Sequence, residues 1–354
     1  MKDTSHQRPR TRDIGIKIGI MPTGNTNSIC DIPSVKVGHI TLIEGEGDLI
    51  KGDGPIRTGV TAIIPREDIS VKHKLPCAVD VINGFGKSVG MVQIDELGEI
   101  ETPILLTNTL NVGKVSQHLI EWMIERCPDT VSVNPVVMEC NDSYLNDIQG
   151  MHVSKEHVFE SLKIAGKDVC EGCVGAGMGM NSFGFKAGIG TASRKVSCGN
   201  NEYILGAIVL NNMGSAGDLR IDGIPVGRIL SGKKPEESSG SIIMIIATNA
   251  PLTAWSLKRV VRRASFGLAR TGSIASHGSG DIALAFSTVG KFEAHVNDTK
   301  IAENHISQFF RACIESVEEA IINSLLKANT VVGHDNNVSK AIDIDNLKDI
   351  LGRY

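Results

Sequence analysis

The clearest hydrophobic pattern is the run at residues 241–248, which reads SIIMIIAT and follows a polar loop at residues 231–240. A short apolar run after such a loop is typical of a strand buried on both faces. Shorter runs predict further strands, at residues 34–43, 59–64, 77–81, 102–108, 131–138, 203–210 and 282–287.

Helical spacing of apolar residues is most regular near the C-terminus, where Ile306, Phe309, Cys313 and Val317 lie on one face. This pattern predicts the longest helix of the chain at residues 303–329. Shorter helices are expected at residues 115–126, 152–165, 252–264 and 344–351. Because strands and helices come in groups and do not alternate, the order favours a layered α/β fold with mixed or antiparallel sheets.

Composition places the chain among globular proteins, with 41% hydrophobic and 21% charged residues in a length of 354. A net charge of −4 and an aromatic content of 4% argue against a nucleic-acid partner. Residues 1–12 are polar and predict a flexible arm that lacks a secretory signal. Since we find no apolar run of membrane-spanning length, we expect a cytoplasmic protein without a membrane partner.

Several motifs that would indicate a cofactor are incomplete. Cys170 and Cys173 form one CxxC, but a zinc ribbon needs a second pair, and the eight cysteines are expected to be reduced and mostly buried. The sequence NGFGKS at residues 83–88 has Val81 where a phosphate-binding loop needs glycine, and Met180 interrupts a possible GxGxxG. We therefore expect no metal and no organic cofactor.

The helix at residues 252–264 and the segment after it are rich in basic residues. A nucleic-acid contact is one interpretation, but a solvated or subunit-facing surface is the more common use of such a face. The basic residues are Lys258, Arg259, Arg262, Arg263 and Arg270.

A serine at the junction of the polar loop and the apolar run suggests a different chemistry. If the Gly240–Ser241 bond were cut, Ser241 would carry a free α-amine beside its own hydroxyl. An α-amine has a pKa of about 7.7–8.0, so it acts as a base near neutral pH. This is the N-terminal form of an activated hydroxyl nucleophile. The preceding glycine leaves the carbonyl open to attack.

Several stretches taken together resemble the DmpA family of self-processing serine aminopeptidases, which includes L-aminopeptidase/D-amidase-esterases and β-peptidyl aminopeptidases. The resemblance extends from about residue 12 to residue 329. The stretches that carry it are RTGVTAIIPR (57–66), NGFGK (83–87), ELGEIETPILLTNTLNVG (96–113), NPVVMECNDSYLND (134–147), FGFKAGIGTASR (183–194), LNNMG (210–214), GSIIMIIATNAPL (240–252) and GLARTGSIASHGSGDIALAFST (267–288).

The resemblance implies an αββα sandwich that is Ntn-hydrolase-like, with a topology shared with ornithine acetyltransferase. It also implies that residues 13–354 form a single catalytic domain, cleaved before Ser241 into chains of residues 1–240 and 241–354. Both chains would stay in one folded unit. Such units would assemble into homo-oligomers of heterodimers.

Site roles follow from the same resemblance, position by position. Ser241 matches the nucleophile, and Ser279 and Asp281 match a serine and an acidic residue that support it. Some relatives have Glu in place of Asp281. Asn212 matches the asparagine whose amide stabilises the oxyanion, a donor typically worth about 10²–10³ in rate.

Two further positions match the substrate-binding part of the family's site. Glu139 matches the carboxylate that holds the substrate's α-ammonium, a charge-assisted contact. Asn141 stands where some relatives carry an aromatic residue. The sequence therefore predicts a self-processing serine aminopeptidase that hydrolyses amides or esters of N-terminal amino acids through an acyl-enzyme. Two alternatives remain open: an acyl transferase on the same scaffold, or a non-catalytic assembly or binding relative.

Overall fold

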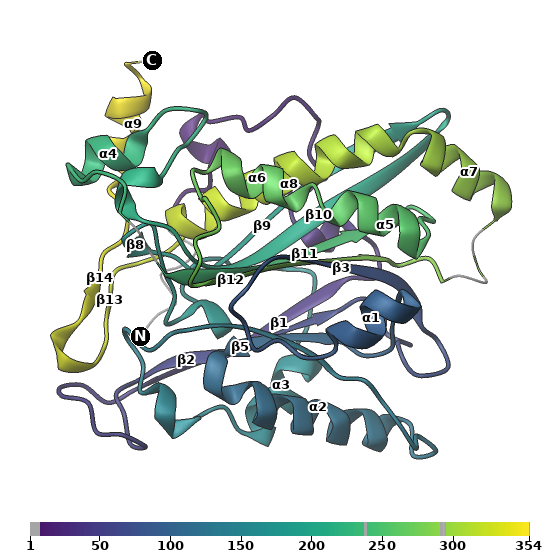
Figure 1. The fold of residues 1–354 in the computed structure, drawn as a ribbon, viewed down its shortest axis with the longest axis horizontal. Coiled ribbons are helices and arrows are strands. Elements are labelled where there is room, and N and C mark those ends of the chain that lie inside the picture. The colour runs from purple at the N-terminus through teal and green to yellow at the C-terminus, as the bar shows by residue number, and fades with distance from the viewer. Residues whose placement is uncertain (1–7, 237–238, 291–292, 294, 354) are drawn as a thin grey trace.

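The structure is a computed structural model that describes residues 8–236, 239–290, 293 and 295–353. Two β-sheets lie face to face at its centre, and helices cover the outer face of each sheet (Figure 1). The two sheets bury an apolar layer between them that includes Ile63, Leu106, Ile208 and Ile243. This four-layer arrangement confirms the predicted αββα sandwich.

The smaller sheet has four strands in the order β1-β2-β5-β6. Their bounds are Lys36–Glu44, Ile56–Ile64, Ile104–Asn108 and Val136–Cys140. Strands β5 and β6 run parallel, whereas β1, β2 and β5 pair antiparallel. Helices α2 (Val112–Arg126) and α3 (Lys155–Lys163) cover its outer face. Pro135 lies just before the edge strand β6, a position that tolerates proline because no ladder hydrogen bond is lost there.

The larger sheet has six strands in the order β4-β3-β12-β11-β10-β9. In that order their bounds are Glu99–Ile100, Leu75–Gly84, Ser279–Ser287, Gly240–Thr248, Asn201–Asn212 and Ile189–Cys198. Only β11 and β12 pair in parallel; the other neighbours are antiparallel. The mixed sheet agrees with the expectation from the order of elements.

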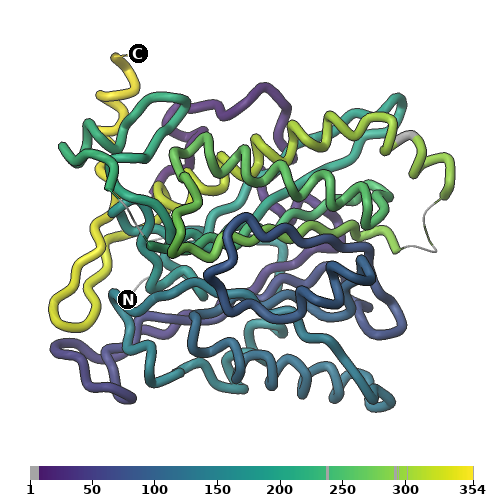
Figure 2. Tube along the Cα trace, in the orientation of Figure 1, coloured from purple at the N-terminus to yellow at the C-terminus, as the bar shows by residue number. Residues whose placement is uncertain are grey.

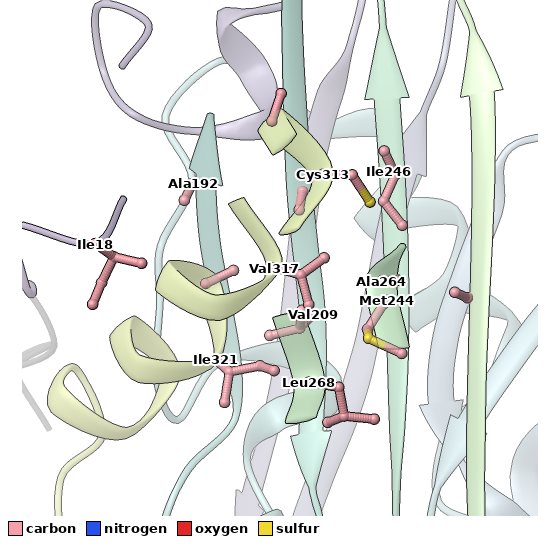
Figure 3. Packing of buried hydrophobic residues seen from close by; sticks show 14 of the residues in the cluster. Ile18, Ala192, Val209, Met244, Ile246, Ala264, Leu268, Cys313, Val317 and Ile321 are labelled. Carbon is pink, nitrogen blue, oxygen red and sulfur yellow. The ribbon is translucent and has the colours of Figure 1, made fainter. Parts of the chain in front are cut away.

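Three helices pack on the outer face of the six-stranded sheet: α5 (Ala254–Val261), α6 (Ala264–Arg270) and α8 (Ile306–Leu326). Figure 3 shows Cys313, Val317 and Ile321 of α8 next to Val209 of β10, with Leu268 of α6 close by. The apolar face predicted for the C-terminal helix is thus the one that covers the sheet.

The predicted helix at residues 303–329 needs a correction. The structure has two helices there, α7 (Val296–Asn304) and α8, separated at His305. The backbone of His305 has φ −102° and ψ 18°, which is outside the helical range, so the hydrogen-bond ladder stops although the apolar spacing continues. Helix α9 (Ile344–Leu351) has the predicted bounds.

Smaller elements complete the fold. The hairpin of β13 and β14 lies at one end of both sheets, where Figure 2 shows the yellow C-terminal segment passing from the upper to the lower half. These elements are α1 (Met91–Leu97), α4 (Val226–Ser231), β7 (Asn181–Ser182), β8 (Phe185–Lys186), β13 (Val331–Val332) and β14 (Val338–Ser339).

The expected arm at residues 1–12 is partly described. Residues 1–7 lie outside the described residues, as do residues 237–238 of the predicted polar loop. Arg8 donates to the carbonyls of Leu326 and Ile342 at 2.7 and 2.6 Å, and Arg12 forms an ion pair with Glu319 at 2.9 Å. The expected flexibility therefore does not extend to residues 8–12.

The basic residues of α5 and α6 have partners on this same chain. Lys258 bonds Asp95 at 2.9 Å, and Arg270 bonds Glu318 at 3.0 Å. The guanidinium groups of Arg259 and Arg263 lie over the ring of Phe310. Five of the eight cysteines are buried. Across the described ranges, no helix has both the length and the apolar character needed to cross a bilayer.

Candidate active site

Strand ends from both sheets meet at one edge of the sandwich. Because β10 and β3 run antiparallel to β11 and β12, the last residues of β10 and β3 lie beside the first residues of β11 and β12. Asn212 of β10 lies opposite Ser241 of β11, and Ser241 lies opposite Gly280 of β12. A cavity of about 410 Å³ opens here, lined in part by Glu139, Asn212 and Ser241. The predicted site residues, distant in sequence, are thus brought together.

Ser241 is the second residue of β11, and its side chain is buried. Its Oγ accepts a hydrogen bond from the Gly280 N–H at 3.1 Å. Because the oxygen is the acceptor, the hydroxyl hydrogen takes no part in this contact. The rigid strand therefore holds the hydroxyl at the cavity in one orientation, with its hydrogen available for transfer to a base.

Gly240 precedes Ser241 at a point where the backbone of β10 approaches closely. A Cβ atom at this position would lie 2.4 Å from the carbonyl oxygen of Asn212 and 2.8 Å from the Cα of Met213. Only glycine fits there without movement of the neighbouring strand. The Gly240–Ser241 peptide is thereby held against the backbone at the end of β10.

Ser279 and Asp281 lie at the start of β12, next to β11, and are both buried. The Ser279 hydroxyl is within hydrogen-bond distance of the Asp281 carboxyl and, at 2.9 Å, of the Ser276 carbonyl. A hydroxyl has one hydrogen, so it donates to one of these at a time. When Asp281 is protonated, it can donate to Ser279 while Ser279 donates to Ser276. The pair can therefore carry a proton in either arrangement.

Burial raises the pKa of Asp281 to about 6, although hydrogen bonds with Ser279 and with the backbone of Ile242 act in the opposite direction. Its Oδ1 has no hydrogen-bond partner among the described residues. An ionised carboxylate with an unpartnered buried oxygen is costly, which is why the proton is held to a higher pH.

Asn212 ends β10 directly opposite Ser241. Its Oδ1 accepts from the Asn181 N–H at 2.9 Å, and its Nδ2 donates to the Asn141 carbonyl at 2.8 Å. These two contacts fix which end of the amide carries the hydrogens. The second Nδ2 hydrogen is not used in either contact, so Asn212 retains a donor at the cavity.

Glu139 is a buried carboxylate near the end of β6. One oxygen accepts from the Lys87 backbone N–H at 2.9 Å, and the other accepts from the Thr109 hydroxyl. Within the described residues it forms no ion pair. A buried carboxylate that is hydrogen-bonded but lacks a cation is suited to receive one from a ligand, because a positively charged group would compensate its desolvation.

Asn141 follows β6 and lies on the cavity wall with Ser143 and Tyr144. Its Oδ1 accepts from the Ser143 N–H at 2.9 Å, which makes a tight turn in this segment. Its side chain is exposed. Asn141 thus shapes the wall, and its own side chain makes a polar contact within the turn.

Ser279 and Asp281 are not among the residues that line the cavity, although they flank Gly280, whose N–H donates to Ser241. The larger cavity of about 560 Å³ around Trp255, between α1, α5 and α7, contains none of the predicted site residues. Among the described residues, no three His, Cys, Asp or Glu side chains are grouped as a metal site would require.

Other residues of the site were not singled out by the sequence. Lys87 contributes a backbone N–H, which carries no signal of residue type, and its ammonium lies 4.2 Å from the ring centre of Phe85. Thr109 and Asn181 act through single hydrogen bonds. The available signal was positional: NGFGK and TNTL directly follow apolar strand runs that end at the same edge.

Comparison with known proteins shows the family of the chain. Residues 27–339 match the model of peptidase family S58. A β-peptidyl aminopeptidase, BapA from Sphingosinicella xenopeptidilytica, is 39% identical over 369 residues, covering 97% of this chain and 91% of that protein.

Two solved structures are similar over nearly the whole length. The PH0078 protein from Pyrococcus horikoshii OT3 has a TM-score of 0.92 and 51% identity. The L-aminopeptidase D-Ala-esterase/amidase from Ochrobactrum anthropi, described as a prototype for the serine aminopeptidases with a variant of the Ntn-hydrolase fold, has a TM-score of 0.87 and 34% identity. Each alignment covers 98% of this chain and 99% of the other.

Proposed function

Since this chain belongs to peptidase family S58, and its relatives include aminopeptidases, we propose that it is a self-processing serine aminopeptidase. It cleaves its own Gly240–Ser241 bond and then uses Ser241 to hydrolyse amides or esters of N-terminal amino acids. The observation that carries the proposal is the position of the Ser241 hydroxyl, which shares one cavity with the Asn212 amide and the unpaired carboxylate of Glu139.

Self-cleavage begins with attack of the Ser241 Oγ on the Gly240 carbonyl carbon. The new C–O bond forms as the C–N bond breaks, and the nitrogen leaves as the α-amine of Ser241 with the proton lost by the hydroxyl. Water then hydrolyses the ester to a Gly240 carboxylate and a free Ser241 hydroxyl. Asn212 and Gly240 line the same cavity, which favours this step because an amide donor then lies in the cavity of the scissile peptide.

The cleaved chains remain together because the sheet interleaves them. Strand β11, apart from Gly240, belongs to the second chain but pairs with β10 of the first, and β12 of the second pairs with β3 of the first. Both pairings lie in the buried centre of the six-stranded sheet. Residues 1–240 and 241–354 thus form one catalytic unit, and assembly of such units into homo-oligomers is part of the proposal.

In turnover, the α-amine of Ser241 takes the hydroxyl proton, since its pKa of about 7.7–8.0 matches neutral pH. The serine attacks the substrate carbonyl and the Asn212 amide donates to the developing oxyanion. The amine or alcohol leaves with the proton, and water attacks the acyl-enzyme by the same route. Ser279 and Asp281 hold the start of β12 and move a proton beside Ser241.

Glu139 makes the enzyme an aminopeptidase. Its buried carboxylate receives the substrate α-ammonium, so the bond that reaches Ser241 is the one after the first residue. The exposed Asn141 leaves that side of the cavity less filled than an aromatic residue would. The names of the relatives suggest L-, D- and β-amino-acid derivatives as the substrates to compare.

The experiment is hydrolysis of L-, D- and β-amino-acid p-nitroanilides by the wild type and Ser241→Ala, with N-acetylated p-nitroanilides as a second set. We expect the wild type to cleave only substrates with a free amine, and Ser241→Ala to be inactive. Activity in Ser241→Ala, or equal cleavage of acetylated substrates, would contradict the proposal.

A further inference from the structure

His334 lies in the turn between β13 and β14, nearly 200 positions from the cavity wall that it contacts. Its Nε2 is 2.9 Å from the carbonyl oxygen of Ser143, and its Nδ1 is 2.8 Å from a carboxylate oxygen of Asp335. A carbonyl and an ionised carboxylate only accept hydrogen bonds. Both contacts are therefore hydrogen bonds only when both ring nitrogens carry hydrogen, that is, when His334 is an imidazolium.

The surroundings of His334 favour that charged form. Burial disfavours it, but the hydrogen bonds to Ser143 and Asp335 and the nearby charge of Asp147 raise the pKa of His334 above its ordinary value. The Leu49 N–H donates to the other Asp335 oxygen at 2.9 Å, and this contact together with His334 lowers the pKa of Asp335. The Asp335 carboxylate is thus kept ionised.

Other charged groups near the hairpin come from three segments. Arg57 of β2 donates to the Val332 carbonyl at 2.8 Å. The loop after β1 contacts Asp335 through Gly47 and Leu49 and carries Glu46 and Asp48. Asp147 is itself bonded to His152 at 2.9 Å. These groups are of both signs, and the carboxylates next to the ring support its positive charge.

The contacted turn is a wall of the active-site cavity. Ser143 and Tyr144 line the cavity, and Ser143 is joined to Asn141 by the hydrogen bond within the turn. The Asn141 carbonyl in turn accepts from the Asn212 amide. One side of the turn is therefore fixed by Asn212, and the other side is fixed by His334.

The hairpin is built closely against this wall. Leu145 packs with Val331, and the His334 N–H donates to the Leu145 carbonyl at 3.3 Å. A Cβ atom on Gly333 would lie 2.4 Å from the Cα of Leu145. Asp335 and Asn336 have φ of 51° and 56°, a left-handed conformation uncommon for residues other than glycine. The contact between His334 and Ser143 is therefore made by a turn with strained backbone.

We propose that His334 is a positioning residue for the substrate cavity: as an imidazolium it holds the Ser143 carbonyl, and substrate binding weakens when it loses one proton. A neutral imidazole has one N–H, which stays on Nδ1 because the Asp335 carboxylate is the stronger acceptor. The contact with Ser143 is then lost and the wall formed by Asn141 and Tyr144 is released. The consequence for catalysis rests on the proposed aminopeptidase function.

The test compares KM and kcat of wild type and His334→Phe, which has no donor, between pH 6 and pH 9, on the p-nitroanilide that the wild type cleaves fastest. At pH 6 we expect KM of the variant to be about 3- to 10-fold higher, as for loss of one hydrogen bond, with kcat within about twofold. By pH 9 the KM ratio should fall to within about twofold. Dividing the KM of the variant by the KM of the wild type at each pH removes the effect of substrate ionisation, which is the same for both enzymes.

Two matched variants sharpen the result. Asp335→Asn removes the counter-charge, so the pH at which KM begins to rise should move lower. His73→Phe changes an exposed histidine that lies near Asp68 and takes part in none of these contacts, and it should leave KM unchanged at every pH. A KM ratio for His334→Phe that is constant with pH, or equal to one throughout, would overturn the proposal.

A measurement without turnover separates this proposal from the proposed function. In Ser241→Ala labelled with ¹⁵N-histidine, both ring nitrogens of His334 should show protonated shifts at pH 6, and Nε2 should lose its hydrogen first. Titration with alaninamide should give a Kd that rises over the same pH range. If these fail while the wild type cleaves substrates, the positioning role is wrong; if they hold without any turnover, the proposed function is wrong.

Discussion

Ser241 and Gly280 face each other across the parallel strands β11 and β12, where the Gly280 N–H donates to the Ser241 hydroxyl oxygen at 3.1 Å. Gly280 also lies under the NGFGK loop, since a Cβ there would be 2.8 Å from the Phe85 carbonyl. The same residue thus orients the serine and lets the loop pack closely against the start of β12. The following predictions depend on the groups around this pair.

Asn212→Ala should lower kcat by about 10²–10³ with a small change in KM, because the lost amide donor acts on the transition state. The rate is measured per processed enzyme, with the processed fraction read from a denaturing gel. Asn201→Ala, at the opposite end of the same strand, is the matched control and should leave kcat unchanged. An unchanged kcat in Asn212→Ala would remove Asn212 from the mechanism.

Glu139→Gln should lower kcat/KM by about 10- to 100-fold, mainly through KM, because a charge-assisted hydrogen bond to the ammonium becomes neutral. Self-cleavage should proceed as in the wild type, since the scissile Gly240–Ser241 peptide has no ammonium. Glu160→Gln, a half-exposed carboxylate on α3 paired with Lys163, serves as the control. Equal KM values in Glu139→Gln and wild type would contradict the role.

Gly240→Ala should slow self-cleavage markedly, because the added Cβ would lie 2.4 Å from the Asn212 carbonyl oxygen and must displace the peptide or the strand end. The time course of fragment formation after synthesis is followed on a denaturing gel. Gly113→Ala, at a position in α2 with nothing within 4 Å of the new Cβ, should process at the wild-type rate. Equal rates for both variants would show that the close approach at Gly240 is irrelevant.

Asp281→Asn should raise thermal stability more at pH 8 than at pH 4.5, while lowering activity. The folded-state pKa of Asp281 is about 6 and its ordinary value is 3.8, so the folded protein holds a proton that the unfolded chain has lost between these values. Stability contributed by this group therefore falls as pH rises from about 4 to about 6. Asparagine does not ionise, so the variant keeps its stability over this pH range.

The comparison is made in the Ser241→Ala background, so that processing does not differ between variants, and Tm is followed by circular dichroism. A Tm difference that is the same at both pH values would contradict the buried, proton-holding environment of Asp281.

The sequence predicted those parts of the fold that depend on local pattern. The apolar run at residues 241–248 became β11 with one residue added, and residues 344–351 became α9. The hydrophobic pattern did not predict helix ends that are set by backbone geometry. His305 divides α7 from α8 although the apolar spacing continues. Strand β9 was not predicted, because its sequence IGTASRKVSC has no continuous apolar run and its identity comes from pairing with β10.

The candidate active site was likewise predictable only in part. Ser241, Asn212 and Glu139 were found through residue type and resemblance, but their meeting at one edge depends on the order of strands in two sheets, which no local pattern contains. Lys87 contributes only a backbone N–H to Glu139, and His334 acts from a turn between two strands of two residues. Such contributions are visible only once distant segments have been brought together.

The most direct test of the account is the covalent state of the purified protein. Intact mass and N-terminal sequencing of the wild type should give two chains, one of residues 241–354 beginning Ser-Ile-Ile-Met, and Ser241→Ala should give one uncut chain. A wild type that is fully active as a single chain of 354 residues, with no new terminus at Ser241, would contradict the central claim.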